Sequence, residues 1–323
     1  MFKISLSYRI VKRCLNKEFL VEHKAVITLV FLVVVMSVCN PYFLTWNNGL
    51  LILQQTSINA IIAVGMTFVI LTRGIDLSVG SVLALSGMFC ASMVYHDLPI
   101  VVVMSLTMLI GAALGLISGF IIVKGNVQPF IATLITMTLF RGLTMVYSQG
   151  YPIPAISHGF EYIGNGRLLG VPISVLTMIV VFMAAFYILK YTRFGRYIYA
   201  LGGNEEATRL AGIKVDRVKL SVYVISGILA ALAAVILTAR LSSAQPTAGS
   251  GYELDAIAAV VLGGTSLFGG KGKIMGTLMG ALIIGLISNA LNLMDVSSYY
   301  QLIVKAVVIL IAVLFDFKLK HSY

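Results

Sequence analysis

Charged residues are scarce in this sequence. Asp, Glu, Lys and Arg together make up 11% of the 323 residues, whereas hydrophobic residues make up 59%. Soluble domains typically carry about 25% charged residues, so this composition excludes a soluble globular protein. We expect an all-α integral membrane protein that crosses the bilayer many times and forms one transmembrane domain over residues 1–323.

Cysteine and histidine are also rare. The three cysteines, Cys14, Cys39 and Cys90, are too few and too dispersed for a disulfide framework or a zinc site. The four histidines likewise lie far apart in the sequence. We therefore expect neither a bound metal nor a cofactor.

The motifs of the familiar nucleotide-binding and catalytic sites are missing. The phosphate-loop pattern G-x-x-x-x-G-K-[ST] is approached only at Gly270 and Lys271, where Thr265 stands at the first glycine position and Gly272 replaces the Ser or Thr. Neither H-E-x-x-H nor G-x-S-x-G occurs. The chain is not expected to bind ATP or to be an enzyme.

Acidic residues are outnumbered by basic ones, 12 to 23, which gives a net charge of +11. Nucleic-acid binding would need a clustered basic face, usually with stacking aromatic residues. Here the excess is spread over the ends of hydrophobic runs, which is typical of the cytoplasmic side of membrane proteins. We therefore expect the chain to contact membrane lipid and not to bind nucleic acid.

Long hydrophobic runs are what the sequence does have. A helix needs about 20 apolar residues to cross a bilayer, and ten runs approach that length. The eighth is too short to be certain, but polar cavities tolerate irregular backbone next to a short helix. The runs are residues 25–41, 50–72, 77–95, 98–123, 130–147, 168–189, 220–239, 255–268, 274–294 and 299–315.

The distribution of Lys and Arg predicts the orientation. With a cytoplasmic N-terminus, 19 of the 23 lie on the inner side, and only Arg141, Arg167, Arg240 and Lys305 do not. This imbalance favours both termini inside and requires an even number of spans, so the eighth run should cross. Residues 1–24 form a cytoplasmic segment, and the first span is retained because no small-x-small cleavage pattern follows the basic region.

Two segments repeat each other weakly. Residues 58–85 and 254–281 align without gaps at an offset of 196 and share six identities in 28 positions. In a chain this rich in Ala, Gly and Val, that is little above chance. Internal repeats are nevertheless common in transporters.

Residues 190–219 are the one long polar interruption and hold 10 of the 35 charged residues. Asn204 can cap a helix whose first residues, Glu205 and Glu206, face the positive end of the helix dipole. Gly212 suits the left-handed residue that ends a helix. The pattern predicts a short cytoplasmic helix over residues 205–211. It serves either as a docking element or as an incidental helix in a solvated loop.

Polar residues in and near the spans are candidates for a solute pathway or vestibule. Arg141 lies near the middle of the fifth span and has either a functional role or a structural one, bonding backbone carbonyls of a broken helix. The amides could line a path for a neutral hydroxylated solute or join helices by hydrogen bonds. The polar stretch before the eighth run lines a vestibule, receives an external protein, or places its carboxylates at a helix N-terminus. The candidates are Gln54, Asn59, Arg141, Ser243, Gln245, Glu253, Asp255, Asn289 and Asn292.

Three stretches resemble the ribose-type permeases of bacterial ATP-driven sugar importers, and the likeness covers nearly the whole chain. They are NAIIAVGMTFVILTRGIDLSVGS at residues 59–81, RFGRYIYALGGNEEATRLAGI at 193–213 and SSAQPTAGSGYELDAIAAVVLGGTSLFGGKGKIMGTLMGALI at 242–283. The resemblance implies a multi-pass permease subunit of the bacterial inner membrane. It would import a monosaccharide, ribose in first place, with xylose, galactose, allose or a furanosyl signal as alternatives.

The resemblance also implies partners. Such permeases pair with a second copy, bind two copies of a cytoplasmic ATPase (or one double-cassette ATPase), and receive sugar from an extracytoplasmic binding protein. A self-sufficient carrier is the less favoured reading. Residues 193–213 resemble the element that couples such permeases to the ATPase, which implies coupling roles for Arg193, Gly195, Arg196, Gly203, Asn204, Glu205, Glu206, Arg209 and Gly212.

Overall fold

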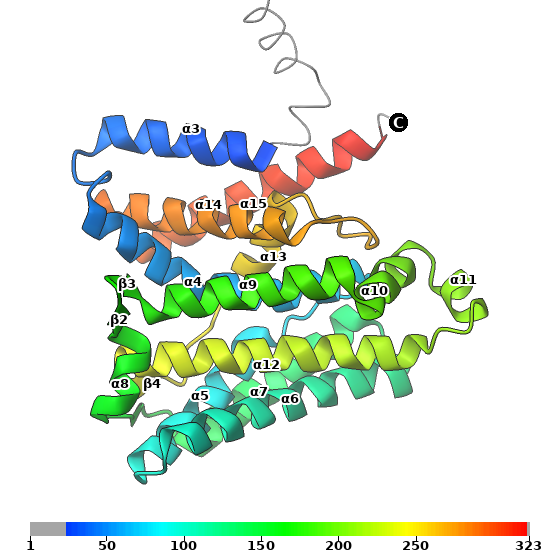
Figure 1. Ribbon diagram of the computed structural model, residues 1–323, viewed down its shortest axis with the longest axis horizontal. Helices are drawn as coiled ribbons and strands as arrows, with labels where there is room; N and C mark the ends of the chain where they lie inside the picture. The colour runs from blue at the N-terminus through cyan, green and yellow to red at the C-terminus, as the bar shows by residue number, and fades with distance from the viewer. Residues whose placement is uncertain (1–23, 322–323) are drawn as a thin grey trace, which may run out of the picture.

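Helices dominate the computed structural model, which describes residues 24–321. Most of them run side by side, with their connections at the two ends of the molecule (Figure 1). The long helices are α3 (Lys24–Cys39), α4 (Trp46–Leu71), α5 (Val79–Tyr95), α6 (Ile100–Lys124), α7 (Pro129–Ser148), α9 (Ile173–Tyr191), α12 (Val215–Leu241), α14 (Ile274–Leu293) and α15 (Ser298–His321). Shorter helices are α8 (His158–Asn165), α10 (Arg193–Gly203), α11 (Glu205–Leu210) and α13 (Tyr252–Leu262).

Two short antiparallel pairs of strands lie in the connections at one end of the molecule. Strand β1 (Ile153–Pro154) pairs with β4 (Ser243–Ala244), and β2 (Arg167–Leu168) pairs with β3 (Val171–Pro172). The β2–β3 hairpin occupies the beginning of the run predicted as a span over residues 168–189. Helix α9 therefore starts only at Ile173.

Six helices within residues 24–321 are long and apolar enough to cross a bilayer: α4, α6, α7, α9, α12 and α14. Helices α3 and α5 are apolar but shorter. Each of the ten predicted runs overlaps a helix. The eighth is the least like its prediction, because α13 ends at Leu262 and Gly264 follows with φ 85°. The protein is an all-α, multi-pass membrane protein.

Prolines mark where three of these helices begin. Pro99 and Pro172 precede the first residues of α6 and α9, and Pro129 is the first residue of α7. Proline is well tolerated there because the first N–H groups of a helix have no partner within the helix. These positions fix the helix starts that hydropathy alone leaves open by several residues.

Helices α4 and α12 form the centre of the bundle. Helix α4 is buried at nearly every position from Thr56 to Leu71. It packs against α9, α12, α13 and α14. Helix α12 approaches α6 through glycine: a Cβ on Gly111 would lie 2.4 Å from the Gly227 carbonyl oxygen, and one on Gly227 would lie 2.1 Å from that of Gly111. Small residues allow such close packing between membrane helices.

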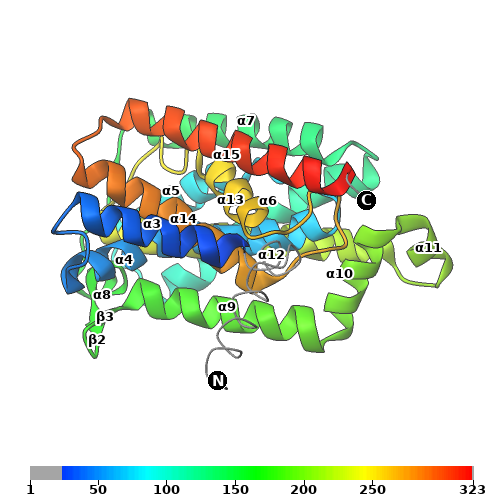
Figure 2. The same ribbon diagram turned by 90° about the horizontal axis from the view of Figure 1, so that it is seen from above.

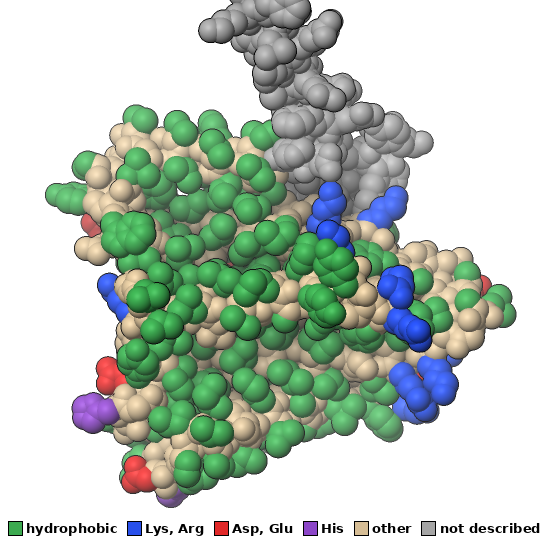
Figure 3. All heavy atoms as spheres, in the orientation of Figure 1, with side chains coloured by type: hydrophobic (Ala, Val, Ile, Leu, Met, Phe, Trp, Pro, Cys, Tyr) green, Lys and Arg blue, Asp and Glu red, His purple; other side chains and the backbone are tan. Residues whose placement is uncertain are grey.

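The two ends of the bundle differ in charge. In Figure 3, Lys and Arg side chains gather at the end that carries α10 and α11, whereas acidic and His side chains are visible at the opposite end. The beginning of α3 and the end of α15 both lie toward the α11 end (Figure 1). The described ends of the chain therefore lie on the same side as the 190–219 segment.

Candidate functional site

A polar cavity lies among five helices, nearer to the end opposite α11. Its volume is about 260 Å³, and its walls come from α4, α12, α13, α14 and α15. The polar residues around it are Gln55, Thr56, Asn59, Arg240, Tyr252, Asp255, Ser288 and Lys305. A cavity with this many hydrogen-bonding side chains inside a membrane bundle is suited to a hydroxylated solute.

Asp255 is the centre of the hydrogen bonds at this cavity. Its Oδ2 accepts from the Lys305 ammonium group at 2.8 Å and from Asn59 Nδ2 at 3.2 Å. The Asp255 side chain is 8% exposed and that of Lys305 is 19% exposed. An unpaired charge would be costly at such a position, so the two side chains stabilise each other there.

Two oxygen atoms at the cavity have no internal partner. Within the described part of the chain, Thr56 Oγ1 and Asn59 Oδ1 are buried and accept or donate no hydrogen bond. Thr56 faces Gly285, where a Cβ would lie 1.8 Å from its Oγ1. Buried polar atoms are normally satisfied, so these two oxygen atoms lack the hydrogen bond that such atoms usually form.

The structure brings two of the nine pathway candidates, Asn59 and Asp255, together at this cavity. Arg141 instead holds a loop, because its Nη1 donates to the carbonyl oxygens of Pro246 at 2.8 Å and Ala248 at 2.9 Å. This geometry corresponds to the structural alternative for Arg141. Glu253 lies half-buried at the start of α13, with Oε1 accepting from the Gly251 N–H.

Asn289 and Asn292 lie at the far end of α14. Asn289 forms a reciprocal pair of side-chain hydrogen bonds with Asn48, at 2.9 and 3.2 Å, which joins α14 to the start of α4. Asn292 accepts from Gln301 at 2.8 Å across the α14–α15 turn. Both amides join helices in this structure.

Of the remaining three candidates, Gln54 lies on α4, whereas Ser243 and Gln245 lie in the connection after α12. Gln54 donates to the Gly164 carbonyl oxygen at 3.1 Å and so joins α4 to the end of α8. Ser243 belongs to β4, and its Oγ accepts from Gln245 Nε2 at 3.1 Å. None of these three side chains lines the polar cavity.

At the other end of the molecule, α11 has the predicted cap. Asn204 Oδ1 accepts from the Ala207 N–H at 3.0 Å, and Gly212 follows the helix with φ 81°. The helix ends at Leu210, one residue earlier than predicted. Cap and stop signals thus identified this element correctly from the sequence.

Ion pairs attach α11 to the beginning of α12. Lys219 bonds both oxygens of Glu205 at 2.7 and 2.8 Å, and Arg209 bonds Asp216 at 2.9 Å. Leu210, at the tip, is 89% exposed. The result is a defined, charged projection with an apolar tip.

Helix α10 is fixed to the end of α4 by Arg73. Its Nε and Nη2 donate to the carbonyl oxygens of Gly202 at 2.8 Å and Gly203 at 2.6 Å. The Gly270 N–H donates to Leu71 O at 3.0 Å, and a Cβ on Gly202 would meet that same oxygen at 1.9 Å. We call this contact of Arg73, Gly202, Gly203 and Gly270 the glycine joint.

Sequence reasoning did not single out the glycine joint or the role of Lys305 at the cavity. The sequence analysis names Lys305 only as a basic residue that does not lie on the inner side, although a charge within an apolar run is itself a signal. Arg73 follows α4 directly and offers no local pattern that distinguishes it from an ordinary loop residue. Its partners are about 130 residues away in the sequence.

Comparisons with known proteins agree over most of the chain. The family model described as branched-chain amino acid transport system / permease component matches residues 48–313. The ribose import permease of Haemophilus influenzae is 61% identical over 303 residues, which cover 93% of this chain and 94% of that protein. The corresponding permease of Escherichia coli is 58% identical over 311 residues (95% and 97%), and that of Bacillus subtilis 56% over 292 residues (90% and 91%). No solved structure matches the chain.

Proposed function

The chain belongs to the family of branched-chain amino acid transport system / permease components, and from this premise we propose that it is the permease through which an ATP-driven importer moves ribose. The observation that carries the proposal is the identity of 56 to 61% with three ribose import permeases over at least nine tenths of the chain. The protein is a transport component of the inner membrane and not an enzyme. It acts with ATPase and binding-protein components.

The polar cavity supports a neutral hydroxylated solute. Asn59, Thr56 and Asp255 offer acceptor and donor atoms in one place, and each hydroxyl group of a sugar can both donate and accept. Permease and binding protein share the task of recognition, so the cavity needs only to satisfy these groups during passage. We assign Asn59 and Asp255 to the pathway, and place the other seven candidates in its supporting structure or at its mouth.

Uptake of labelled sugar tests the function. The chain, together with its ATPase and binding protein, should restore ribose uptake to bacteria that lack a ribose permease. Excess unlabelled ribose should compete, whereas leucine should not. Uptake of leucine instead of ribose would overturn the proposed substrate, and ribose uptake that persists without any ATPase would identify a self-sufficient carrier.

We also propose ten membrane crossings with both termini in the cytoplasm. Ten helices overlap the ten apolar runs, and Lys and Arg gather at the α11 end, toward which α3 begins and α15 ends. Helix α13 spans only about 16 Å at the helical rise of 1.5 Å per residue. The irregular segments on either side of it would complete that crossing where protein, not lipid, surrounds them.

The ATPase is proposed to dock on α10 and α11. This region projects beyond the spanning helices (Figure 1) and exposes charged side chains around Leu210. Charges at such a surface set orientation and encounter rate more than affinity. The proposed coupling residues are Arg193, Gly195, Arg196, Gly203, Asn204, Glu205, Glu206, Arg209 and Gly212.

Replacing Glu206→Gln and Arg209→Gln together tests this docking surface. Glu206 is exposed, and Arg209 fastens α11 through Asp216, so the double variant should lose about 90% of uptake and of ATPase co-purification. Arg167→Gln, at the opposite end of the molecule, is the matched control. Normal uptake with normal co-purification in the double variant would refute the assignment.

A second copy is proposed to cover the face formed by α7, α13 and α15, with one ATPase for each copy. Figure 2 shows α7 and α15 along the same side of the molecule. Helix α7 buries one narrow stripe that includes Thr136, Phe140 and Thr144, and leaves most of its other positions exposed. The irregular backbone next to α13 would not tolerate lipid. A disulfide cross-link between Gly142→Cys of one copy and Gly142→Cys of the other should trap a dimer. Leu109→Cys, on α6, should form no such cross-link.

A further inference from the structure

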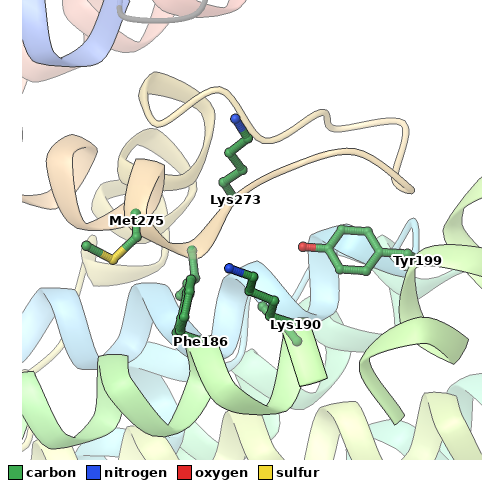
Figure 4. Close-up of a pocket in the computed structure, with 7 residues that line it drawn as sticks. Phe186, Lys190, Tyr199, Lys273 and Met275 are labelled. Carbon is green, nitrogen blue, oxygen red and sulfur yellow. The ribbon is translucent and has the colours of Figure 1, made fainter. Parts of the chain in front are cut away.

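Two hollows lie at opposite ends of the bundle, and they differ in how their polar groups are placed. The hollow near α11 has a volume of about 340 Å³ and a mostly apolar lining between α9, α10 and the beginning of α14. In Figure 4 the Lys273 amine points away from the Lys190 amine. The Tyr199 hydroxyl donates to the Gly272 carbonyl oxygen at 2.9 Å. The polar cavity at the other end, of about 260 Å³, is therefore better suited to a sugar.

Several polar groups of the polar cavity are already engaged within the protein. Lys305 donates to Asp255 Oδ2 at 2.8 Å, and the Asn59 amide donates to the same oxygen at 3.2 Å. The Ser288 hydroxyl donates to a carbonyl oxygen of its own helix at 3.0 Å. These side chains shape the cavity and keep its wall polar, but their hydrogen bonds are directed to protein atoms.

Three other side chains of the cavity have free polar atoms. Within residues 24–321, the side chains of Gln55, Arg240 and Tyr252 form no hydrogen bond or ion pair, and all three are partly exposed. They come from α4, α12 and α13. The charges of Arg240 and Asp255 both act on the Tyr252 hydroxyl. The free groups therefore lie around one part of the cavity.

Arg240 reaches this part of the cavity from the last turn of α12. It follows Leu237, which lines the same cavity, by three residues, and side chains three residues apart share one face of a helix. Its backbone is fixed against the end of α8. The Arg240 carbonyl oxygen accepts from Asn165 Nδ2 at 3.2 Å, and Gly164 has no room for a Cβ beside the Arg240 N–H. This packing fixes the point from which the side chain leaves the helix.

The charge of Arg240 has no carboxylate of its own in the described part of the chain. Asp255 is the only acid among the residues that line the cavity, and it pairs with Lys305 at 2.8 Å. The negative end of the α12 dipole stabilises a positive charge in the last turn, but a lysine would benefit from it equally. The property peculiar to arginine is a planar fork that offers parallel N–H groups to two neighbouring oxygen atoms.

We propose that Arg240 recognises a vicinal pair of sugar hydroxyl groups in the polar cavity, and that Gln55 and Tyr252 complete this site. The inference rests on the proposed function, because ribose carries such pairs. Neighbouring hydroxyl oxygens on a sugar ring match the two arms of a guanidinium fork, and each hydroxyl can accept and donate at once. The Gln55 carbonyl and the Tyr252 oxygen accept from those hydroxyls. A sugar without a vicinal pair leaves one arm of the fork unused.

Arg240→Lys separates the positive charge from the fork. The variant keeps the charge at the end of α12 but cannot bond two neighbouring oxygens in one plane. With its ATPase and binding protein present, its maximum rate of ribose uptake should fall about tenfold, because a hydrogen bond from a charged group is lost. Arg167→Lys, exposed at the same end of the molecule, should take up ribose at the native rate.

Protection from phenylglyoxal tests direct contact in the protein of native sequence. This reagent modifies arginine side chains, and peptide mass spectrometry of the purified full-length permease gives the rate of modification at each one. Ribose should slow the modification of Arg240 severalfold and leave that of Arg167 unchanged. The analogue 2,3-dideoxyribose has no vicinal pair of hydroxyl groups and should protect neither residue. D-Ribonate, which carries a carboxylate, distinguishes a diol site from an anion site.

Native uptake by Arg240→Lys, or the absence of protection by ribose, would each overturn the inference and leave the assignment as a ribose permease intact. Equal protection by ribose and 2,3-dideoxyribose would show that the vicinal pair is not recognised. Protection by D-ribonate alone would make Arg240 an anion site, which also overturns the inference. Failure of the native permease to take up any ribose would instead overturn the proposed function, and this inference with it.

Discussion

Asp255 and Lys305 place a carboxylate and an ammonium group together at the edge of the polar cavity. Both are largely removed from solvent, and Asn59 donates a further hydrogen bond to the same carboxylate oxygen. Removing one partner of a buried ion pair costs more than removing both, because the remaining charge has no counter-ion. The pair therefore stabilises the contact between α13 and α15 and makes this edge of the cavity polar.

Lys305→Met should lower the free energy of unfolding by about 3 kcal/mol. Adding Asp255→Asn should recover most of that loss, since neither charge is then left unpaired. Thermal unfolding of the purified permease, read as a double-mutant cycle, measures the coupling. If the loss of unfolding free energy in the double variant equals the sum of the losses in the two single variants, the pair contributes no coupling energy.

Gly285 leaves room for the Thr56 hydroxyl beside the cavity. A Cβ at Gly285 would meet Thr56 Oγ1 at 1.8 Å, so Gly285→Ala should displace Thr56 and reduce ribose uptake by about tenfold. Thr56→Ala removes the obstructing oxygen and should restore space in the double variant. Gly49→Ala, where a Cβ meets nothing within 4 Å, is the control. Unchanged uptake in Gly285→Ala would show that this part of the cavity does not belong to the pathway.

The sequence identified single polar residues of this cavity but not their partners. Asn59 was predicted because polar groups in apolar runs are costly, and Asp255 because it belongs to the polar stretch before the eighth run. Asp255 contacts Asn59 on α4 and Lys305 on α15, and these helices are distant from α13 in the sequence, so no local pattern contains the contacts. The same reason explains why Asn289 was grouped with the pathway: its partner, Asn48, lies 241 residues away.

The helices differ in how accurately the sequence predicted their first and last residues. Helix α11 was predicted within one residue, because its cap, acidic first turn and terminal glycine are all local signals. Helix α13 was predicted too long, because hydropathy continues past Leu262 into a segment that two glycines turn. The β1–β4 pair joins Ile153 to Ala244 and had no local signal at all.

The weak repeat gains significance from the packing of α4 and α13. These helices belong to the two aligned segments and lie against each other. Asn59 and Asp255 occupy equivalent positions at the offset of 196 residues, and they are hydrogen-bonded to each other. The side chains at equivalent positions thus meet at the cavity, as expected when a binding site forms between repeats.

The glycine joint connects α10 to α4, the helix that carries Asn59 to the cavity. Arg73→Lys keeps the charge but loses the planar fork that bonds both carbonyl oxygens. We expect ATP hydrolysis by the assembled importer to continue while ribose moved per ATP falls about fivefold. Arg217→Lys, exposed at the start of α12, is the control. Parallel loss of hydrolysis and uptake would indicate failed assembly instead of lost coupling.

Across the whole molecule, charge and function are divided between the two ends. The end with α11 holds the glycine joint and a cluster of Lys and Arg side chains, whereas the polar cavity lies toward the opposite end. An ATP-driven importer requires this division, since the solute arrives on one side and the ATPase acts on the other. Rigid helices such as α4 and α12 connect the two ends, so a change at one can bias the state of the other.

The proposed orientation can be tested with two exposed leucines at opposite ends. Leu210 is 89% exposed on α11, and Leu169 is 97% exposed in the β2–β3 turn. In a background with the native cysteines replaced by Ser, a membrane-impermeant maleimide should label Leu169→Cys through the permeable outer envelope while the inner membrane is intact. It should label Leu210→Cys only after that membrane is opened. The positive side chains around α11 favour this result, because basic segments tend to be retained in the cytoplasm. Labelling of Leu210→Cys in intact cells would place the proposed ATPase surface outside the cell. A cytoplasmic ATPase could then not act through α10 and α11.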